Sequence, residues 1–122
     1  ETIYKLKAKV IAGAANNQLG TEAIHGTVLQ ERGIVYAPDF LINAGGIINV
    51  YAELEGYDKH EIMRKTENIY NTTIEILESA AKNGITTNQA AVNIAKSRIE
   101  ERKTANSKYN PKIILFLRGE RL

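Results

Sequence analysis

Two stretches of the sequence combine uncharged polar side chains with unusually bare backbone. The first reads AGAANNQ, residues 12–18, and the second reads PDFLINAGG, residues 38–46. An asparagine amide offers two donors and one acceptor and carries no charge, so it binds a polar ligand without competing for protons. Glycine and alanine leave room for a ligand to approach the main chain. These residue types favour a binding site for a small polar molecule.

The Gly45-Gly46 pair interrupts an apolar run that otherwise reads as a helix. Each glycine costs roughly 1 kcal/mol relative to alanine in a helix interior. One interpretation is that the helix passes close to a ligand there, with Asn43 directed into the same cleft. The other is close packing of the helix against a sheet. A similar choice applies to Asn16-Asn17, which could bind a ligand or simply turn the chain.

Composition excludes several classes of function. The chain has 122 residues, enough for one domain, with 16 basic and 14 acidic residues, a balance that does not indicate a nucleic-acid partner. It has no cysteine, which fits a reducing cytoplasm and excludes disulfides and thiolate metal sites. His25 and His60 are expected at the surface, and no spacing of histidine, aspartate and glutamate suggests a metal site. No run approaches the roughly 20 apolar residues of a membrane span, and no signal peptide is visible.

The first half of the chain predicts alternating strands and helices. Short β-branched runs predict strands at residues 8–14 and 34–37. Between them, a helix with Ile24, Val28 and Leu29 on one face is expected to stop at Gly33. After Pro38, Asp39 is expected to cap a single helix that runs through Leu54. Strand, helix, strand, helix is the pattern of a parallel α/β sheet.

The second half predicts two long helices. Asp58 and Glu61 have the spacing of a capping box, and Asn83-Gly84 is a helix stop. Apolar residues recur between them every three or four positions. Thr87 is expected to cap the last helix. The expected apolar face of this last helix comprises Ala91, Ile94, Ala95 and Ile99.

We interpret the chain as the end of a larger α/β domain. Two strands do not make a stable sheet, and the first begins so near Glu1 that its neighbours are expected upstream. The expected divisions are residues 1–57, with the strands; 58–103, with the closing helices; and an irregular tail, 104–122. Within the tail, the run IILFL could be a strand, an interface segment or a non-native extension. Ligands bind at the carboxyl ends of parallel strands, where both polar stretches lie.

Three segments carry a family resemblance. KAKVIAGAANNQL, RGIVYAPDFLINAGGIINV and RKTENIYNTTIEIL resemble the leucine dehydrogenases of the glutamate, leucine, phenylalanine and valine dehydrogenase family. The resemblance covers roughly residues 3–103. It implies the C-terminal part of a Rossmann-like, doubly wound NAD-binding domain followed by long C-terminal helices. The family's catalytic lysine and aspartate and its G-x-G-x-x-G motif are then expected upstream, so no catalytic residue is assigned to this chain.

The resemblance implies NAD as the cofactor and oxidative deamination of an amino acid as the reaction. The bare backbone would let the nicotinamide and ribose approach closely, and Asn17 corresponds to an asparagine that contacts substrate. The expected cofactor-binding residues are Ala12, Gly13, Ala14, Ala15, Asn16 and Asn17. The expected partners are a small amino acid and further copies of the complete enzyme, with no nucleic acid and no membrane.

The resemblance also implies a substrate pocket on the helix after Gly45-Gly46. Ile47 and Val50 match positions that line the side-chain pocket in leucine dehydrogenases, although such residues at helical spacing are more often plain core. Glutamate-specific relatives carry a small hydroxyl residue where this chain has Val50. An apolar wall would leave a γ-carboxylate buried and unpaired, so an aliphatic substrate is expected. The expected substrate-binding residues are Asn17, Asn43, Gly45, Gly46, Ile47 and Val50.

Two functions from different classes remain open at this point. The chain is either part of an NAD-dependent dehydrogenase of branched-chain amino acids or a non-catalytic fragment that acts as a folding or association module. The last helices could couple opening and closing of a cleft, or simply cover the sheet. An upstream lysine-bearing domain and a G-x-G-x-x-G motif would favour the enzyme.

Overall fold

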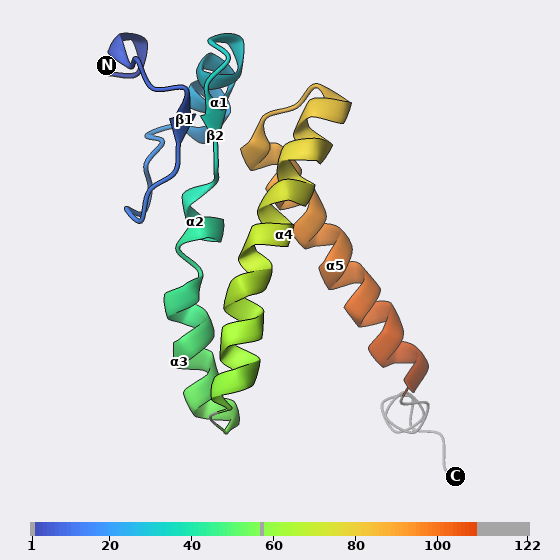
Figure 1. Cartoon of the computed structure of the whole chain (residues 1–122). Helices are drawn as coiled ribbons and strands as arrows, with labels where there is room; N and C mark the ends of the chain where they lie inside the picture. The colour runs from blue at the N-terminus through green and yellow to red at the C-terminus, as the bar shows by residue number, and fades with distance from the viewer. Residues whose placement is uncertain (1, 57, 110–122) are drawn as a thin grey trace. The chain divides into compact units, whose positions relative to one another are not determined.

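The structure, a computed structural model, describes residues 2–56 and 58–109. The chain divides into two compact units, Glu1–Ala91 and Val92–Leu122, and both strands lie in the first. The described part is mostly helical, with one small parallel sheet (Figure 1). In chain order the elements are η1 (Ile3–Lys5), β1 (Val10–Ile11), α1 (Glu22–Glu31), β2 (Val35–Tyr36), α2 (Asp39–Ile42), α3 (Gly45–Glu55), α4 (Lys59–Asn83) and α5 (Thr87–Tyr109).

The sheet consists of β1 and β2, and the predicted parallel arrangement is confirmed. Val10 lies opposite Val35 and Ile11 opposite Tyr36. Both strands are shorter than the predicted ranges 8–14 and 34–37. Leu29, Ile34 and Tyr36 form a small buried core, against which pack partly buried apolar residues from η1, β1 and the loop after β1. This parallel register places the two chain segments that follow the strands at the same edge of the sheet.

Helix α1 ends where the sequence predicted, and of its expected buried face Leu29 is buried and Val28 partly buried, whereas Ile24 is not. Gly33 has φ +65°, and the Ile34 N–H returns to the Leu29 carbonyl at 2.9 Å, as in a glycine-terminated helix. Ile24, expected on the buried face, is 60% exposed. The buried residues of α1 are Leu29 and Gly26, and an added Cβ at Gly26 would lie 3.4 Å from Thr86 Cγ2. A glycine contact gives no apolar signal in the sequence, which explains the wrong prediction for Ile24.

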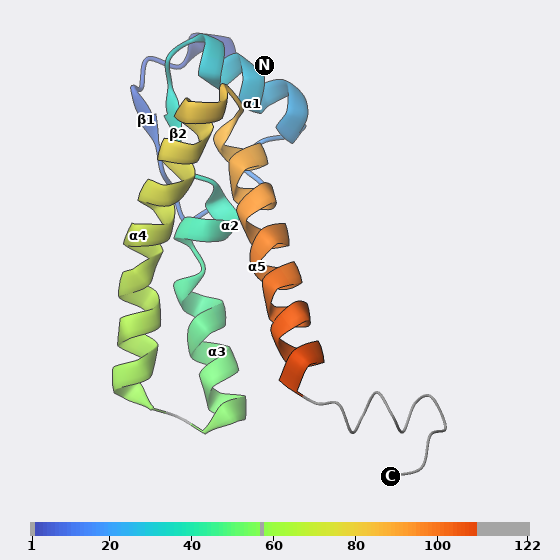
Figure 2. The same cartoon turned by 90° about the vertical axis from the view of Figure 1, so that its right-hand side faces the viewer.

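The single helix predicted from Asp39 through Leu54 is in fact two helices, α2 and α3. Pro38, not Asp39, precedes the first helical residue, and Asn43 and Ala44 form a turn between the two helices. The Ala44 N–H bonds to the Leu41 carbonyl at 3.1 Å, a tight turn that interrupts the regular ladder. Low helix propensity at Gly45-Gly46 and an Asn43 side chain bonded elsewhere account for the break. Helices α3 and α4 then lie side by side (Figures 1 and 2).

Helix α4 begins and ends at the predicted signals. Asp58 accepts hydrogen bonds from the backbone N–H groups of His60 and Glu61, and the Glu61 carboxylate lies 2.8 Å from Lys65 Nζ. Gly84 adopts the left-handed conformation with φ +64°. The buried residues of α4 are Ile62, Ile76 and Ala80. Local chemistry at both ends therefore defines the longest helix of the described chain.

We expect Asp58→Ala to lower the free energy of unfolding by about 1 kcal/mol, the usual effect of removing an N-cap. The first-turn N–H groups would lose their side-chain acceptor, while no apolar core contact would change. Thermal or urea unfolding of variant and wild type measures the difference. An unchanged melting temperature would show that water replaces the cap at no cost.

Helix α5 differs from the prediction at both ends. Its cap is Thr86 rather than Thr87, since Thr86 Oγ1 accepts from the Gln89 N–H at 3.2 Å. The helix continues to Tyr109, beyond the predicted boundary at residue 103, because residues 104–109 contain neither glycine nor proline. Ala91 is buried as predicted, whereas Ile99 is 54% exposed. The apolar tail run lies outside the described residues. Among residues 2–56 and 58–109, no helix is long and apolar enough to cross a membrane.

Candidate functional site

An open hollow of about 650 Å³ lies where the segments after β1 and β2 meet. The loop after β1 and the segment from α2 to the start of α3 supply most of its lining, and Glu22 at the start of α1 supplies the rest. The lining residues are Ala14, Asn16, Asn17, Glu22, Asp39, Phe40, Asn43, Ala44 and Ile47. This is the edge of the sheet at which ligands of parallel α/β domains bind.

The hollow gathers part of the set that the sequence singled out. Five of the residues expected to bind cofactor or substrate line it: Ala14, Asn16, Asn17, Asn43 and Ile47. Ala12, Gly13, Ala15, Gly45, Gly46 and Val50 belong to the same two segments but do not line it. The sequence did not predict that Glu22, Phe40 and Asp39 line the hollow. The sequence signal for Asp39 was only its place after a proline, which indicated a helix cap.

The Gln18 side chain fixes the shape of the loop after β1. Its amide nitrogen donates to the Gly13 carbonyl at 2.8 Å and to the Ala15 carbonyl at 2.9 Å. An added Cβ at Gly13 would lie only 3.1 Å from that nitrogen. Within the described chain, the bare backbone of Gly13 therefore makes room for the Gln18 amide.

Asp39 lines the hollow and connects the two segments through a hydrogen bond. This carboxylate is 7% exposed; Oδ2 accepts from the Gln18 backbone N–H at 3.2 Å, and Oδ1 accepts from the Phe40 N–H at 2.9 Å. The Tyr36 hydroxyl accepts from the Asp39 N–H at 3.3 Å. Burial raises the pKa of Tyr36, and the adjacent Asp39 charge and side-chain hydrogen bond raise it further, against the opposing effect of the Asp39 backbone bond. Tyr36 therefore stays a neutral phenol at physiological pH.

The asparagines are held in distinct ways. Asn17 has φ +53°, the only positive φ of a non-glycine residue in the described chain. Asparagine tolerates this left-handed conformation better than most residues. The Asn43 amide nitrogen donates to Asn16 Oδ1, a direct bond between the two segments. The loop after β1 is thus joined to the segment after β2 at both Gln18 and Asn16.

Helix α3 leaves an apolar stripe uncovered within the described chain. Ile47, Val50 and Leu54 are 70%, 59% and 81% exposed, at the i, i+3, i+7 spacing of one helix face. Gly45 lies toward α4, where an added Cβ would make ordinary contact with Thr66 Cγ2 at 3.5 Å. At Gly46 an added Cβ would meet no atom of residues 2–56 and 58–109 within 4 Å. Packing within the described chain therefore does not explain the glycine at position 46.

The acidic side chains of the hollow accept hydrogen bonds from uncharged donors. Asn88 donates to Glu22 Oε2 at 2.6 Å, while Asn88 Oδ1 is buried without a partner among the described residues. Within residues 2–56 and 58–109, no group of three or more histidine, cysteine, aspartate or glutamate residues could hold a metal ion. The side chains present suit a polar organic ligand, because amides, a small-residue backbone and an apolar wall converge on one space.

A family model for glutamate/leucine/phenylalanine/valine dehydrogenases matches residues 1–107 of the chain. This chain belongs to the glutamate/leucine/phenylalanine/valine dehydrogenase family. It is 50% identical over 107 residues to an L-tryptophan dehydrogenase of Nostoc punctiforme and 50% identical over 109 residues to a leucine dehydrogenase of Bacillus cereus. These alignments cover 88% and 89% of the chain. The phenylalanine dehydrogenase of Caldalkalibacillus thermarum is 46% identical over 111 residues, or 91% of the chain.

The crystal structure of the L-tryptophan dehydrogenase from Nostoc punctiforme shares the fold, with a TM-score of 0.79 over 82% of the chain at 50% identity. The chain spans about 30% of the length of each of these dehydrogenases. Its small parallel sheet and long helices are those of part of an α/β enzyme of the glutamate/leucine/phenylalanine/valine dehydrogenase family.

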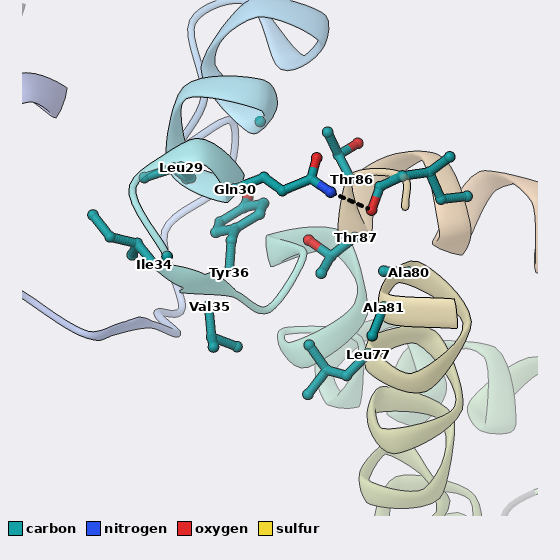
Figure 3. A pocket seen from close by; sticks show the side chains of 13 residues that line it. Leu29, Gln30, Ile34, Val35, Tyr36, Leu77, Ala80, Ala81, Thr86 and Thr87 are labelled. Atoms are coloured by element: carbon teal, nitrogen blue, oxygen red, sulfur yellow. Dashed lines mark hydrogen bonds between the residues drawn. The ribbon is translucent and has the colours of Figure 1, made fainter. Parts of the chain in front are cut away.

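A second groove in this dehydrogenase-family chain has a different character. It encloses about 350 Å³ between α1 and β2 on one side and the end of α4 on the other. Figure 3 shows its mainly aliphatic walls and the Gln30 amide, which donates to the Ile85 carbonyl at 3.3 Å. None of the residues expected to bind cofactor or substrate lines it. The hollow at the strand ends is therefore the stronger candidate for the family's ligand site.

Proposed function

We propose that this chain is part of an NAD-dependent oxidative deaminase of branched-chain L-amino acids. The reaction converts L-leucine, NAD⁺ and water to 4-methyl-2-oxopentanoate, ammonium, NADH and a proton. The observation that carries the proposal is the parallel register of β1 and β2, which brings Asn16 and Asn17 to the same hollow as Asn43 and Ile47. Membership of the dehydrogenase family supports the reaction class.

The residues of the hollow suit a nicotinamide and a small zwitterion. When bound, NAD supplies the acceptor for the hydride that leaves the amino acid's α-carbon. The side chain of Ala14 is only a methyl group, so a flat ring can lie close to the backbone there. Asn16 and Asn17 offer donors and acceptors that remain uncharged during turnover, which suits a carboxamide or a carboxylate. We place NAD on the side of the loop after β1, in a Rossmann-like domain to which this chain contributes.

The exposed face of α3 supports an aliphatic substrate. Ile47 and Val50 lie one turn apart on the uncovered stripe, and Ile47 lines the hollow. The α3 sequence, GGIINVYAELE, contains no lysine or arginine that could pair with a substrate γ-carboxylate. The leucine side chain would cover apolar surface on this stripe, which is favourable by roughly 25 cal/mol per Å². A glutamate side chain would instead lose hydration without gaining a cationic partner.

The proton-transfer residues are assigned to the remainder of the enzyme, and the hollow supplies binding and orientation. The complete enzyme, here meaning the longer dehydrogenase to which we assign this chain, is further expected to form a homo-oligomer. The 122-residue chain by itself is expected to show no NAD-dependent deamination.

Steady-state kinetics of the complete enzyme test the proposal directly. Leucine, valine, phenylalanine, tryptophan and glutamate are compared with NAD, and ammonium and NADH formation are both measured. We expect the highest kcat/KM for a branched aliphatic substrate. A preference for tryptophan or phenylalanine would refute the substrate assignment, and the absence of NADH formation with all five would refute the reaction. Turnover by the purified 122-residue chain would refute the placement of the proton-transfer residues.

Gly46→Ala is expected to separate stability from function in the complete enzyme. Its Cβ would meet no atom of the described chain within 4 Å, so the free energy of unfolding should stay the same or rise by up to about 1 kcal/mol, as a melting curve would show. The methyl group would occupy space that we assign to the ligand, and the KM for leucine should rise at least about fivefold, as expected for a clash of about 1 kcal/mol. Gly45→Ala is the matched comparison, since its Cβ would face Thr66. An equal KM for both variants and wild type would favour a purely structural glycine pair.

A further inference from the structure

The loop after β1 holds a conformation that its own sequence does not enforce. Asn17, in this loop, is left-handed, a conformation that asparagine tolerates but that neighbouring bonds must select. The surrounding loop residues are small, and none of Ala14, Ala15, Asn16 or Asn17 is buried. Besides the bond from Asn43 to Asn16, the restraint on this loop comes from the flanking residue Gln18, which is partly buried.

Gln18 restrains the loop through its side chain and also through its backbone N–H. Its side chain closes the loop onto the carbonyls of Gly13 and Ala15. Its backbone N–H, immediately after Asn17, donates to Asp39 Oδ2 at 3.2 Å. A buried carboxylate that accepts backbone N–H bonds is a strong acceptor, and it is costly to leave unpaired. The two residues act in series, because Asp39 anchors Gln18 and Gln18 closes the loop.

We infer that Asp39 and Gln18 are positioning residues, which hold the loop after β1 so that Asn16 and Asn17 face the hollow in the orientation that binds nicotinamide. The inference rests on the proposed function for the identity of the ligand. The restraint on the loop is a property of this chain's own residues. Asp39 itself lines the hollow from below, and its two carboxylate oxygens are both used by backbone N–H groups.

The test compares four single variants of the complete enzyme: Gln18→Ala, Asp39→Asn, Asp39→Ala and Asp58→Ala. Gln18 is only partly buried and uncharged, so this variant keeps the test valid if the Asp39 variants fold poorly. Asp58 is the matched control, since it also accepts two backbone N–H bonds but at the exposed start of α4. The measurements are NADH affinity by fluorescence, KM and kcat for each substrate, melting temperature, and hydrogen exchange of the peptide that covers residues 13–18 in the ligand-free protein.

We expect Gln18→Ala to weaken NADH binding about 3- to 10-fold, the usual effect of one or two lost hydrogen bonds, and Asp39→Ala to weaken it about tenfold or more. Both should raise the KM for NAD more than they lower kcat, and both should speed exchange of the 13–18 peptide. Asp39→Asn should lie between wild type and Asp39→Ala, because its remaining oxygen can still accept one bond. Asp58→Ala should lower the melting temperature with unchanged NADH affinity.

Two results would overturn the inference. One is unchanged NADH affinity and unchanged 13–18 exchange in both Gln18→Ala and Asp39→Ala, whatever the melting temperature. The other is an equal loss of NADH affinity in Asp58→Ala, which would indicate general destabilisation. If wild type forms no NADH from any amino acid, the proposed function fails, while faster exchange in the Gln18 and Asp39 variants alone would still support the restraint of the loop.

Discussion

Replacing Asn17 by alanine should lower kcat/KM for leucine at least about tenfold in the complete enzyme. A tenfold loss corresponds to about 1.4 kcal/mol, within the range for one hydrogen bond to a charged group. Asn17 lines the hollow, and its side chain is exposed rather than packed, so the fold should persist. Steady-state kinetics and a melting curve measure the two effects separately.

A second substitution distinguishes the Asn17 amide from its backbone. Asn17 has φ +53°, which strains alanine, whereas glycine adopts it freely. If the amide binds ligand, Asn17→Gly should lose as much activity as Asn17→Ala. If only the turn matters, Asn17→Gly should retain wild-type kinetics. Asn71→Ala, which removes an exposed amide from the middle of α4, is the control and should leave kcat/KM unchanged.

Val50→Ser should weaken leucine turnover by roughly 5- to 30-fold in kcat/KM. The lost contact with two methyl groups is worth about 1–2 kcal/mol if the substrate side chain covers this residue. Val50 is 59% exposed in the described chain, so a serine there leaves no cavity within it. Glutamate should improve only slightly, because α3 supplies no cation. The comparison uses leucine, norvaline and glutamate with the variant and with wild type.

Val35→Ser provides the matched control for this experiment. Val35 is a similarly exposed valine, at 43%, but it lies on β2 in the second groove rather than in the hollow. The ratios among the three substrates should stay fixed in this control and change in Val50→Ser. Fixed ratios in both variants, together with a lower melting temperature for Val50→Ser, would assign Val50 to the core of the complete enzyme.

Local signals predicted the order of the elements and several of their ends. Asp58 and Gly84 bound α4 because a capping carboxylate and a left-handed glycine act on neighbouring backbone groups. The same kind of signal placed the end of α1 at Gly33. It could not predict the division between α2 and α3, since there the Asn43 side chain bonds to Asn16, far away in the sequence.

The candidate site, too, could be predicted from the sequence only in part. The polar loops were recognisable from residue type, and the parallel register confirmed that two of them meet. The hydrogen bond between Asp39 and Gln18 could not be predicted from residue type. The two residues lie 21 positions apart, and the bond depends on where each strand ends. Similarly, the close approach of Gly26 to Thr86 extends the buried face of α1 beside Leu29, a contact that the apolar pattern of the sequence does not reveal. The cofactor and substrate roles themselves stay predictions.

The uncovered stripe on α3 has a consequence for anyone who engineers this chain as a separate domain. Ile47, Val50 and Leu54 are the kind of exposed apolar residues that solubility screens and surface-redesign protocols replace first. A library selected only for expression yield or heat resistance would therefore drift toward polar residues at these positions. Two of the three belong to the proposed substrate wall. Selection for a more soluble fragment would therefore remove the proposed substrate contacts before any assay of the complete enzyme could detect the loss.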